Sequence, residues 1–492
     1  MRMNDLKQWL SPWLADAPSI TVNRLTLDSR QVTLGDVFVA IAGHQVDGRR
    51  FIPAAIEAGA VAIVQQADDA MARLDWHHEV PVISLPDLPT MLSALAARFY
   101  HDPQQRVGLI GVTGTNGKTT VSQLIAQWLD ALNAPTAVMG TTGNGFIGRL
   151  QAAENTTGDA ISIQAQLATF ADQGAKHVAM EVSSHGLVQG RVASLAFDAA
   201  VFTNLSHDHL DYHGTLAAYA EAKKQLFSLG NPLKVINADD KVGRQWLREW
   251  PEAIAVALHA DSLQHHVGPY VRATQIDFAT DGVRVMVETS WGQGELNAAL
   301  VGDFNVSNLL VSLATLLGLG YSLDALLATS DQLNAVIGRM EVFLAPDKPT
   351  MVVDYAHTPD ALEKALIALR RHCRGKLWCV FGCGGDRDTR KRPVMARIAE
   401  QYADQAVLTN DNPRSEAPNA ITDDMLAGMQ APDNAWVEHD RARALSRVMQ
   451  AAKADDIVLV AGKGHEDYQV LADGKVHYSD RETVAALLKE LP

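Results

Sequence analysis

Cysteine is scarce in this chain, whose 492 residues include three copies, at Cys373, Cys379 and Cys383. So few cysteines argue against a disulfide framework and are typical of proteins from a reducing compartment. Cys379 and Cys383 stand four positions apart at the end of an expected strand, where a metal pair is one interpretation. Burial as small apolar side chains is the better interpretation.

Long apolar runs are also absent. No stretch approaches the roughly 20 consecutive apolar residues that span a bilayer. Residues 1–10 carry scattered charges and no apolar core of the length found in signal peptides. We therefore expect a cytoplasmic protein that does not insert into a membrane.

Positive charge is the third shortage, because 42 Lys and Arg face 57 Asp and Glu, which gives a net charge of −15. This balance argues against a protein that binds the nucleic-acid backbone. A hydrophobic content of 47% with 20% charged residues is typical of a globular protein with a large core. The length of the chain suggests roughly three domains.

A glycine-rich loop is the most informative stretch that is present. Residues 111–120 read GVTGTNGKTT and lie between an apolar strand, 107–112, and a helix with apolar residues on one face. In this context backbone N–H groups and the helix dipole can bind a phosphate, while Lys118 reaches the outer phosphates of a nucleotide and Thr119 holds Mg²⁺. The usual pattern, G-x-x-x-x-G-K-[ST], has glycine where this chain has Val112. The alternative interpretation is a tight turn with a helix-capping lysine. Turn geometry alone does not explain three glycines followed by Lys-Thr at one junction of strand and helix.

Alternating strand and helix patterns predict an α/β fold throughout. Short strands and helices occupy residues 1–88, repeated strand–helix patterns occupy 89–335, and a third α/β unit occupies 336–492. The repeated pattern of the central region predicts a mainly parallel sheet covered by helices. We therefore expect three domains, of which the N-terminal one is the smallest.

Polar residues cluster directly after the expected strands. The clusters are residues 181–185 and 207–213 in the central region, and 355–359, 382–388, 410–414 and 461–467 in the C-terminal region. In open α/β sheets ligands bind beyond the carboxyl ends of the strands. Several such loops at one edge of a sheet predict a composite ligand site.

Two of these clusters contain groups that suit a divalent cation. Glu181 offers a carboxylate oxygen and His209 an imidazole nitrogen. The run at 207–213, HDHLDYH, has a second interpretation as a dinuclear metallohydrolase site. The pattern of those hydrolases, H-x-H-x-D-H, places its last two ligands side by side, whereas Tyr212 separates them here. Such hydrolases also have no use for a nucleotide loop.

Lys223 lies on the apolar face of an expected helix at 215–228. It shares that face with Tyr219, Leu226 and Phe227. From spacing alone, the favoured interpretation is a lysine that lays its methylenes on apolar surface and extends its amine to solvent.

Short segments along nearly the whole chain resemble the Mur ligases, in the order in which that family has them. The segments are 114–119 (GTNGKT), 154–157 (ENTT), 181–186 (EVSSHG), 204–211 (NLSHDHLD), 338–341 (GRME), 354–359 (DYAHTP) and 411–414 (DNPR). The spelling GTNGKT is itself typical of this superfamily and accounts for Val112. Within the family, the resemblance extends to the members that add meso-diaminopimelate.

The resemblance implies a small N-terminal α/β domain for the UDP end of the substrate (1–88), a central P-loop ATPase domain with a mainly parallel sheet (89–335) and a Rossmann-like C-terminal domain for the incoming amino acid (336–492). It implies a cytoplasmic reaction of peptidoglycan precursor synthesis. ATP, with Mg²⁺, phosphorylates the D-glutamate γ-carboxylate of UDP-N-acetylmuramoyl-L-alanyl-D-glutamate, and the amino group of meso-diaminopimelate displaces the phosphate. Phosphorylation supplies the leaving group that a carboxylate lacks. We expect a monomer that binds neither nucleic acid nor membrane.

The resemblance also carries over the nucleotide and metal residues. The catalytic set it implies is Lys118, Glu181, His209, Lys223 and Arg339, with Arg339 near the γ-phosphate. The residues that resemble ATP contacts are Gly114, Thr115, Asn116, Gly117, Lys118, Thr119, Thr120, Asn305, Asp354 and His357. The Mg²⁺ ligands it implies are Thr119, Glu181, His209 and Lys223, the last as a carbamate formed with CO₂.

The substrate residues fall into three groups by the resemblance. The uridine-nucleotide contacts are Leu27, Ser29, His44, Gln45 and Val46. The contacts to the muramoyl-peptide portion are Asn155, Thr156, Thr157, Ser183, Gln189 and Arg191. The diaminopimelate contacts are Arg387, Asp411, Asn412, Pro413, Arg414, Gly462 and Glu466.

The identity of the amino acid rests mainly on Arg414. Diaminopimelate has a distal carboxylate that lysine lacks, and a guanidinium can bind it with two hydrogen bonds. A lysine-adding Mur ligase, which lacks this arginine, is one alternative. A folylpolyglutamate synthase shares the ATPase logic but needs neither the N-terminal domain nor the loop at 411–414. A binding protein without activity would be expected to lose Lys118, Glu181 or Lys223.

Overall fold

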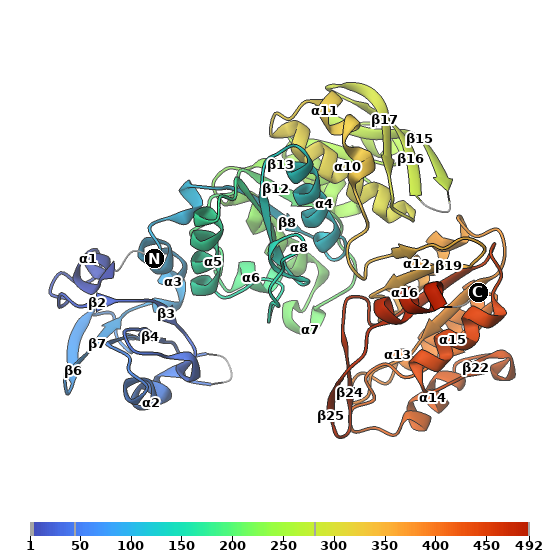
Figure 1. The fold of residues 1–492 in the computed structure, drawn as a ribbon. Helices are drawn as coiled ribbons and strands as arrows, with labels where there is room; N and C mark the ends of the chain where they lie inside the picture. The colour runs from blue at the N-terminus through green and yellow to red at the C-terminus, as the bar shows by residue number, and fades with distance from the viewer. Residues whose placement is uncertain (1–3, 44–45, 280–281, 491–492) are drawn as a thin grey trace. The chain divides into compact units, whose positions relative to one another are not determined.

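The computed structural model describes residues 4–43, 46–279 and 282–490 and has the predicted α/β architecture (Figure 1). Its residues form two compact units. The first comprises 1–115, 134–201 and 206–234, and the second comprises 116–133, 202–205 and 235–492. The division into three domains stays a prediction, because each unit combines segments from two of them. No helix in the described part of the chain is long and apolar enough to cross a membrane.

A five-stranded sheet organises the N-terminal part of the first unit. Its order is β3-β4-β5-β7-β6, and neighbouring strands are parallel except β6 and β7. The strands are β3 (Leu25–Thr26), β4 (Val37–Ala40), β5 (Ala62–Gln66), β6 (Arg73–His77) and β7 (Val80–Leu85). The sequence analysis missed β6 because this edge strand is mostly exposed and lacks the apolar alternation that reveals a half-buried strand.

Helix α3 (Leu88–Phe99) completes the core beside this sheet. It packs against α1 (Leu6–Leu10), and the indole N–H of Trp9 donates to the carbonyl of Leu95 at 3.0 Å. The N-terminal turn of α5 (Ala160–Asp172) contributes to the same buried cluster. One hydrophobic core is therefore shared by the N-terminal segment and a helix of the central segment.

The central part of the first unit forms a second sheet region, in which the strand order is β10-β9-β11-β8-β12. Strand β11 is parallel to both β8 and β9, whereas β10 is antiparallel to β9. The strands are β8 (Gly108–Thr113), β9 (Thr136–Gly140), β10 (Gly143–Phe146), β11 (His177–Glu181) and β12 (Ala199–Phe202). The helices that follow β11 and β12 are α6 (Ser184–Val188), α7 (Leu210–His213) and α8 (Leu216–Lys224). The predicted strand at 107–112 corresponds to β8, and β11 ends at the first residue of the polar cluster 181–185.

The second unit begins with α4 (Lys118–Ala131), which packs against α10 (Asp303–Gly318). Its strands run in the order β13-β14-β15-β16-β17, parallel as far as β15 and antiparallel beyond it. They are β13 (Leu233–Asn237), β14 (Ile254–Ala257), β15 (Tyr270–Ala279), β16 (Gly282–Thr289) and β17 (Gly292–Ala298). The sequence analysis missed β17 because its glycines and polar residues hide the strand pattern.

The C-terminal part of the second unit contains a six-stranded sheet of order β18-β19-β23-β20-β21-β22, parallel except for the edge strand β18. Its strands are β18 (Glu341–Phe343), β19 (Thr350–Asp354), β20 (Leu377–Phe381), β21 (Gln405–Leu408), β22 (Trp436–Val437) and β23 (Ile457–Ala461). Because β19, β20, β21 and β23 are parallel neighbours, their carboxyl ends lie at one edge. The predicted polar loops therefore converge there.

Helices cover both faces of this sheet (Figure 1). The helices on one face are α12 (Pro359–Arg370), α13 (Lys391–Tyr402) and α14 (Pro418–Leu426). The helices on the other face are α15 (Arg441–Ala451) and α16 (Asp480–Glu490). Along β20, Cys379 faces the first group and Trp378 the second, as the two-residue period of a strand requires.

The buried cysteines belong to this core. Cys379 and Cys383 are both free thiols, with relative exposures of 0% and 3%. Burial raises the pKa of the Cys383 thiol to about 12, so that it remains protonated. The interpretation of these residues as small apolar side chains is confirmed.

Candidate active site

The second half of the glycine-rich loop opens helix α4. Gly117 caps the helix with φ of 85°, and a Cβ at this position would lie 2.5 Å from Oδ1 of Asn308, so the turn requires glycine. The peptide of Asn116 is held at both ends, because its N–H donates to Asn204 Oδ1 at 3.0 Å and its carbonyl accepts from Asn204 Nδ2 at 3.1 Å. Thr119 and Thr120 are buried in the first helical turn. This arrangement presents a helix N-terminus, which favours an anion.

The first half of the loop belongs to the first unit, where it lies over helix α8 of the same unit. The amine of Lys223 donates to the carbonyl of Gly114 at 2.8 Å and lies 4.3 Å from the centre of the Tyr219 ring. Ser206 N donates to the Thr115 hydroxyl at 3.0 Å. Lys223 is 1% exposed. The interpretation from spacing alone, in which its amine reaches solvent, is therefore wrong, because the loop 109 residues earlier covers this face of the helix.

Glu181 occupies the end of β11 and is 1% exposed. One carboxylate oxygen accepts the backbone N–H of Thr141 at 2.8 Å, and the other lies 3.3 Å from the Thr141 hydroxyl. A Cβ at Gly140 would approach Glu181 Oε1 to 2.0 Å, so glycine at the end of β9 makes room for the carboxylate. A carboxylate has further lone pairs, so Glu181 can still accept a cation.

The two central clusters meet through their imidazoles. The ring of His185, after β11, lies 4.9 Å from that of His209, after β12, and 5.5 Å from that of His213. His213 Nε2 is hydrogen-bonded to the Ser184 hydroxyl at 2.9 Å. Burial, followed by the nearby His209, lowers the pKa of both His185 and His213, so these two rings are held neutral near pH 7.

His209 itself lies at the edge of this cluster. Its backbone is left-handed, with φ of 52°, and its Nε2 lies 3.4 Å from a carboxylate oxygen of Asp208. Among residues 4–43, 46–279 and 282–490, no group of three or more His, Cys, Asp or Glu side chains is arranged to hold a metal ion.

Four of the predicted muramoyl-peptide contacts form one hydrogen-bonded group. Arg191 donates to the carbonyl of Thr157 at 2.7 Å and to the amide oxygen of Gln189 at 2.9 Å through Nε. The Thr157 hydroxyl accepts from Ser183 N at 2.9 Å and donates to the carbonyl of Glu181 at 2.9 Å. These residues are thereby tied to the strand that carries Glu181.

Thr156 and Asn155 have contacts outside that group. The Thr156 hydroxyl is 3.1 Å from the hydroxyl of Thr141, the residue that also binds Glu181. Asn155 instead lines a separate cavity in the first unit. The six predicted contacts are therefore not gathered at a single point.

This cavity, which we call the N-terminal cavity, has a volume of about 1130 Å³. Its walls come from segments 24–31, 39–43, 46–54 and 144–166, with Tyr100. The predicted residues that line it are Leu27, Ser29, Val46 and Asn155. His44 and Gln45 lie outside the described residues. The sequence analysis missed Arg24, Arg30, Phe51, Tyr100 and Glu154, which also line the cavity.

The predicted nucleoside contacts lie in two places in the second unit. Asn305 is buried in α10, where its Nδ2 donates to the carbonyl of Val301 at 2.9 Å. Asp354, at the end of β19, accepts the N–H of Met340 at 2.8 Å, and burial raises the pKa of its carboxyl. His357 follows, with Nδ1 2.8 Å from the carbonyl of Tyr355.

Arg339 lies beside these residues. Its guanidinium carbon is 4.6 Å from the centre of the Tyr355 ring, and its Nε is buried without a hydrogen-bond partner in the described part of the chain. The His465 ring lies 5.1 Å from the same tyrosine. Tyr355 and His465 were not singled out from the sequence, although both belong to polar loops that it identified. A buried, unsatisfied guanidinium atom suits a residue that awaits an anionic ligand.

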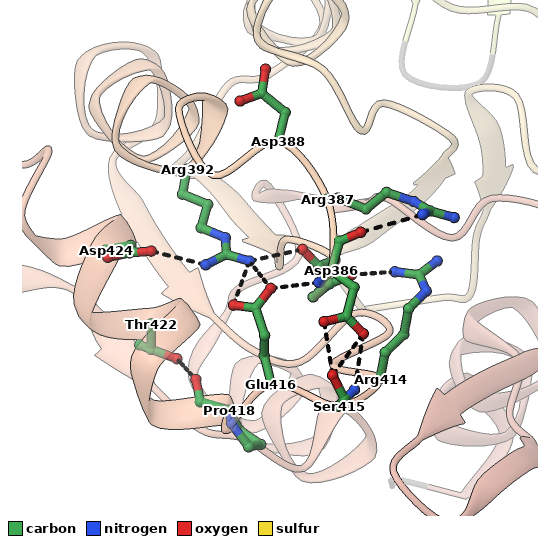
Figure 2. Close-up of polar contacts among 12 residues, drawn as sticks. Asp386, Arg387, Asp388, Arg392, Arg414, Ser415, Glu416, Pro418, Thr422 and Asp424 are labelled. Atoms are coloured by element: carbon green, nitrogen blue, oxygen red, sulfur yellow. Dashed lines mark hydrogen bonds and ion pairs between the residues drawn. The ribbon is translucent and has the colours of Figure 1, made fainter.

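Two of the loops at the C-terminal edge, those after β20 and β21, are cross-linked by hydrogen bonds (Figure 2). Arg414 has a left-handed backbone, with φ of 52°, and donates through Nη1 to the carbonyl of Gly385 at 2.8 Å. The carboxylate of Asp386 accepts from the Ser415 hydroxyl at 2.8 Å. Arg387 is exposed and donates to the carbonyl of Asp386 at 3.3 Å. These bonds bring the predicted Arg387 and Arg414 to one edge.

A buried arginine contacts both of these loops. The guanidinium of Arg392 in α13 lies 2.8 Å from the carboxylate of Glu416 and 2.9 Å from that of Asp424 (Figure 2). It also donates to the carbonyl of Gly384 at 3.2 Å. Only 2% of its side chain is exposed. The sequence analysis missed Arg392 because an arginine within a helix is ordinarily assigned to the surface.

The loop after β23 joins the loop after β21. Gly462 has φ of 116°, and a Cβ there would lie 2.7 Å from a carboxylate oxygen of Asp411. Asn412 Nδ2 donates to Glu466 Oε2 at 3.2 Å. Asn412 and Pro413 are buried, whereas Asp411, Arg414 and Glu466 are partly exposed. The structure therefore brings the predicted diaminopimelate contacts together. We call the loops 382–388, 409–416 and 461–467 the amino-acid loops.

Comparisons with known proteins agree with this layout. Residues 21–100 match the family described as Mur ligase family, catalytic domain, residues 112–316 match the Mur ligase middle domain, and residues 338–464 match the Mur ligase, glutamate ligase domain. The UDP-N-acetylmuramoyl-L-alanyl-D-glutamate--2,6-diaminopimelate ligase of Vibrio cholerae is 53% identical over 99% of both chains.

Solved structures extend the comparison. A UDP-N-acetylmuramoyl-L-alanyl-D-glutamate--2,6-diaminopimelate ligase is 36% identical, with a TM-score of 0.72 over 99% of both chains. The MurF ligase from Thermotoga maritima, solved in complex with ADP, is 18% identical and has a TM-score of 0.60 over 89% of this chain and 94% of its own. The second likeness concerns the fold alone.

Proposed function

We infer that this chain, which belongs to the Mur ligase family, is an ATP-dependent ligase that joins meso-2,6-diaminopimelate to the D-glutamate γ-carboxyl of UDP-N-acetylmuramoyl-L-alanyl-D-glutamate. Full-length identity of 53% to a relative with that name carries the inference. The phosphate loop and the basic and acidic groups of the amino-acid loops agree with it. The reaction belongs to the synthesis of peptidoglycan precursors and so to cell wall biogenesis.

We propose one role for each predicted domain. Residues 1–88, with the N-terminal cavity, would hold the UDP end of the substrate. Residues 89–335 would bind ATP, and residues 336–492 would bind the amino acid. The ATP and UDP-linked substrates are supplied in the cytoplasm, where we propose that the protein works as a monomer.

The first chemical step transfers the γ-phosphoryl group of ATP to an oxygen of the D-glutamate γ-carboxylate, which yields an acyl phosphate and ADP. The loop N–H groups at the start of α4, together with Lys118, would hold the phosphates. Arg339, with its unsatisfied Nε, would bind the transferred group. Fixed cations and dipoles neutralise the negative charge that gathers as two anions meet.

The second step joins the two substrates. The neutral amino group of diaminopimelate attacks the acyl carbon, the C–N bond forms, the C–O bond to phosphate breaks, and the nitrogen loses a proton to solvent. Phosphate leaves as a stable anion, whereas the unactivated carboxylate has no such leaving group. The chain must therefore hold the amine beside the acyl phosphate and keep water away from it.

We propose that Mg²⁺ is held by Thr119, Glu181 and His209, with Lys223 as a carbamate. The carboxylate of Glu181 is buried at the end of β11, and carboxylate oxygens are the ligands that a hard cation prefers. Bound Mg²⁺ would neutralise phosphate oxygens. A neutral Lys223 amine can add CO₂ to form N–CO₂⁻ with release of one proton. A ¹³C signal that appears with ¹³C-bicarbonate and is lost in Lys223→Arg would support the carbamate, and a signal unchanged in the variant would contradict it.

The choice of diaminopimelate over lysine rests on Arg414. Its Nη1 is engaged with Gly385, which leaves the rest of the guanidinium for the distal carboxylate. A lysine-adding ligase is the alternative, and it would have no use for this group.

Phosphate release tests the proposal. The protein is incubated with UDP-N-acetylmuramoyl-L-alanyl-D-glutamate, ATP and Mg²⁺, and with meso-diaminopimelate, L-lysine or no amine. We expect release with diaminopimelate alone. Release with lysine alone would overturn the choice of amino acid. Release with neither amine, but with a folate and L-glutamate, would favour a folylpolyglutamate synthase.

A further inference from the structure

Lys463 is a fully buried lysine among the amino-acid loops. Its relative exposure is 0%, and it lies between Gly462 and Glu466 in the loop after β23. Its ammonium is 3.2 Å from Asn412 Oδ1, 3.1 Å from Glu466 Oε2 and 5.6 Å from the centre of the Tyr468 ring. Lysine is almost never fully buried unless it is paired. Here both partners are residues that the sequence predicts to bind the amino acid.

The contact determines how the Asn412 amide is oriented. Its Oδ1 accepts from Lys463 Nζ and from the backbone N–H of Val470, the latter at 2.8 Å. Its Nδ2 donates to Glu466 Oε2. A flipped amide would place its NH₂ group against two donors, so the network permits one orientation only.

The contact also orients the Glu466 carboxylate. Oε2 receives both Lys463 and Asn412, while no hydrogen bond among the described residues uses Oε1. The side chain of Glu466 is 16% exposed. The carboxylate therefore keeps one oxygen available, in a direction that the buried ammonium imposes.

We propose that Lys463 is a positioning residue of the amino-acid site. It aligns Glu466 Oε1 and the remaining Asn412 N–H for the distal end of a diamino dicarboxylate, whose ammonium would meet Glu466 while Arg414 binds its carboxylate. Lys463 does not touch the substrate. The proposal rests on the function inferred above.

The competing explanation is that Lys463 only balances the charge of Glu466 within the fold. Both explanations predict a loss of stability when the ammonium is removed, because Glu466 would lose its partner. They differ in substrate binding. Positioning affects the amino acid and not ATP, whereas a merely structural role affects both KM values together or neither.

Four single variants and one double variant separate the explanations. Lys463→Met keeps the length and removes the ammonium. Lys463→Gln keeps a hydrogen-bond donor without charge. Glu466→Gln is measured alone and combined with Lys463→Met in a double-mutant cycle. Lys453→Met, an exposed lysine of the same domain, is the matched control.

The KM values for meso-diaminopimelate and ATP, kcat and the melting temperature are measured for each protein. In Lys463→Met we expect a diaminopimelate KM at least ~10-fold higher with the ATP KM within about twofold of wild type. Lys463→Gln should show a smaller rise, and Lys453→Met none. The increase in the diaminopimelate KM of the double variant should be well below the product of the increases in the two single variants, since both changes act through one carboxylate.

Equal changes in the two KM values, an unchanged diaminopimelate KM, or multiplicative effects in the cycle would each overturn the proposal. If Lys463→Met does not fold, the two KM values of Lys463→Gln decide in the same way. Wild-type protein that releases no phosphate with diaminopimelate would overturn the proposed function instead, so the two failures are distinguishable.

Discussion

The N-terminal cavity and the amino-acid loops differ in how far their charged side chains are buried. In the cavity, Arg30 pairs at 2.8 Å with Asp28 of its own loop, and 87% of its side chain is exposed. Beneath the amino-acid loops, the side chains of Arg392, Arg441 and Lys463 are at most 2% exposed. Each of these three cations joins segments that are distant in the sequence or fixes a residue that faces the ligand.

The difference follows from the proposed ligands. Diaminopimelate is small and carries opposite charges at each end, so its recognition requires charged groups held at fixed positions. A UDP-linked muramoyl peptide is large and offers much surface, so a wide cavity can bind it through many modest contacts. We therefore propose that selectivity in the amino-acid site depends on charges held at fixed positions, whereas the cavity relies on shape.

The largest expected effect comes from removing the guanidinium of Arg414, which we propose binds the distal carboxylate of diaminopimelate. Arg414→Ala should raise the diaminopimelate KM on the order of 150- to 5000-fold, because an unpaired carboxylate in a closed site costs ~3–5 kcal/mol. The ATP KM should stay unchanged. Steady-state kinetics of Arg414→Ala and Arg30→Ala measure the contrast. If the diaminopimelate KM were raised equally in Arg30→Ala, or were unchanged in Arg414→Ala, the proposed difference between the two regions would be contradicted.

Removing a buried cation should reduce stability next most strongly. Arg441 forms a buried ion pair with Asp480 at 2.7 Å and donates to the carbonyl of Ala461 at 2.8 Å. Arg441→Met should lower the free energy of unfolding by about 3 kcal/mol, since the carboxylate is left buried and unpaired. Arg443→Ala, at an exposed arginine two positions along the same helix, is the control for denaturant titration. A loss no larger than that of the control would mean that the buried pair contributes little.

A change in the shape of the N-terminal cavity should have a smaller effect on substrate binding. Leu27→Ala removes part of its apolar wall, and we expect the KM for the UDP-linked substrate to rise roughly tenfold, as for other losses of a few methylenes. The diaminopimelate KM should not change. Leu34→Ala, at an 80% exposed leucine of the same region, controls for general damage. An effect on both substrates would contradict separate sites.

The smallest expected effect is on acid stability near the cavity. Burial acts to raise the pKa of Asp36, but hydrogen bonds from Arg24 and Thr33 outweigh it and leave that pKa lowered. A lowered carboxyl pKa gives stability that is present above the unfolded value of about 3.9 and is lost as the pH falls through the folded value. Asp36→Asn should therefore lose less melting temperature between pH 5 and pH 3 than wild type. Equal losses would show that the pair is not coupled to folding.

Local patterns predicted much of the fold. The strands β19, β20, β21 and β23 and their polar loops follow from apolar runs that end in polar clusters, and parallel pairing brings the loops to one edge. Prediction failed where the local pattern is weak, as in the exposed β6 and the glycine-rich β17. It also failed for the Lys223 amine, because helix spacing cannot reveal what covers a face.

Local sequence patterns indicated the phosphate loop, most of the strands and helices, and the polar loops after the strands. These features depend on neighbours within a few positions. Only the tertiary structure decided which charges are buried and which partners they have. Lys463 reaches Asn412 across 51 residues, and Arg441 reaches Asp480 across 39. Burial depends on such distant contacts, so the local sequence around a lysine does not show whether that lysine is buried in the folded chain.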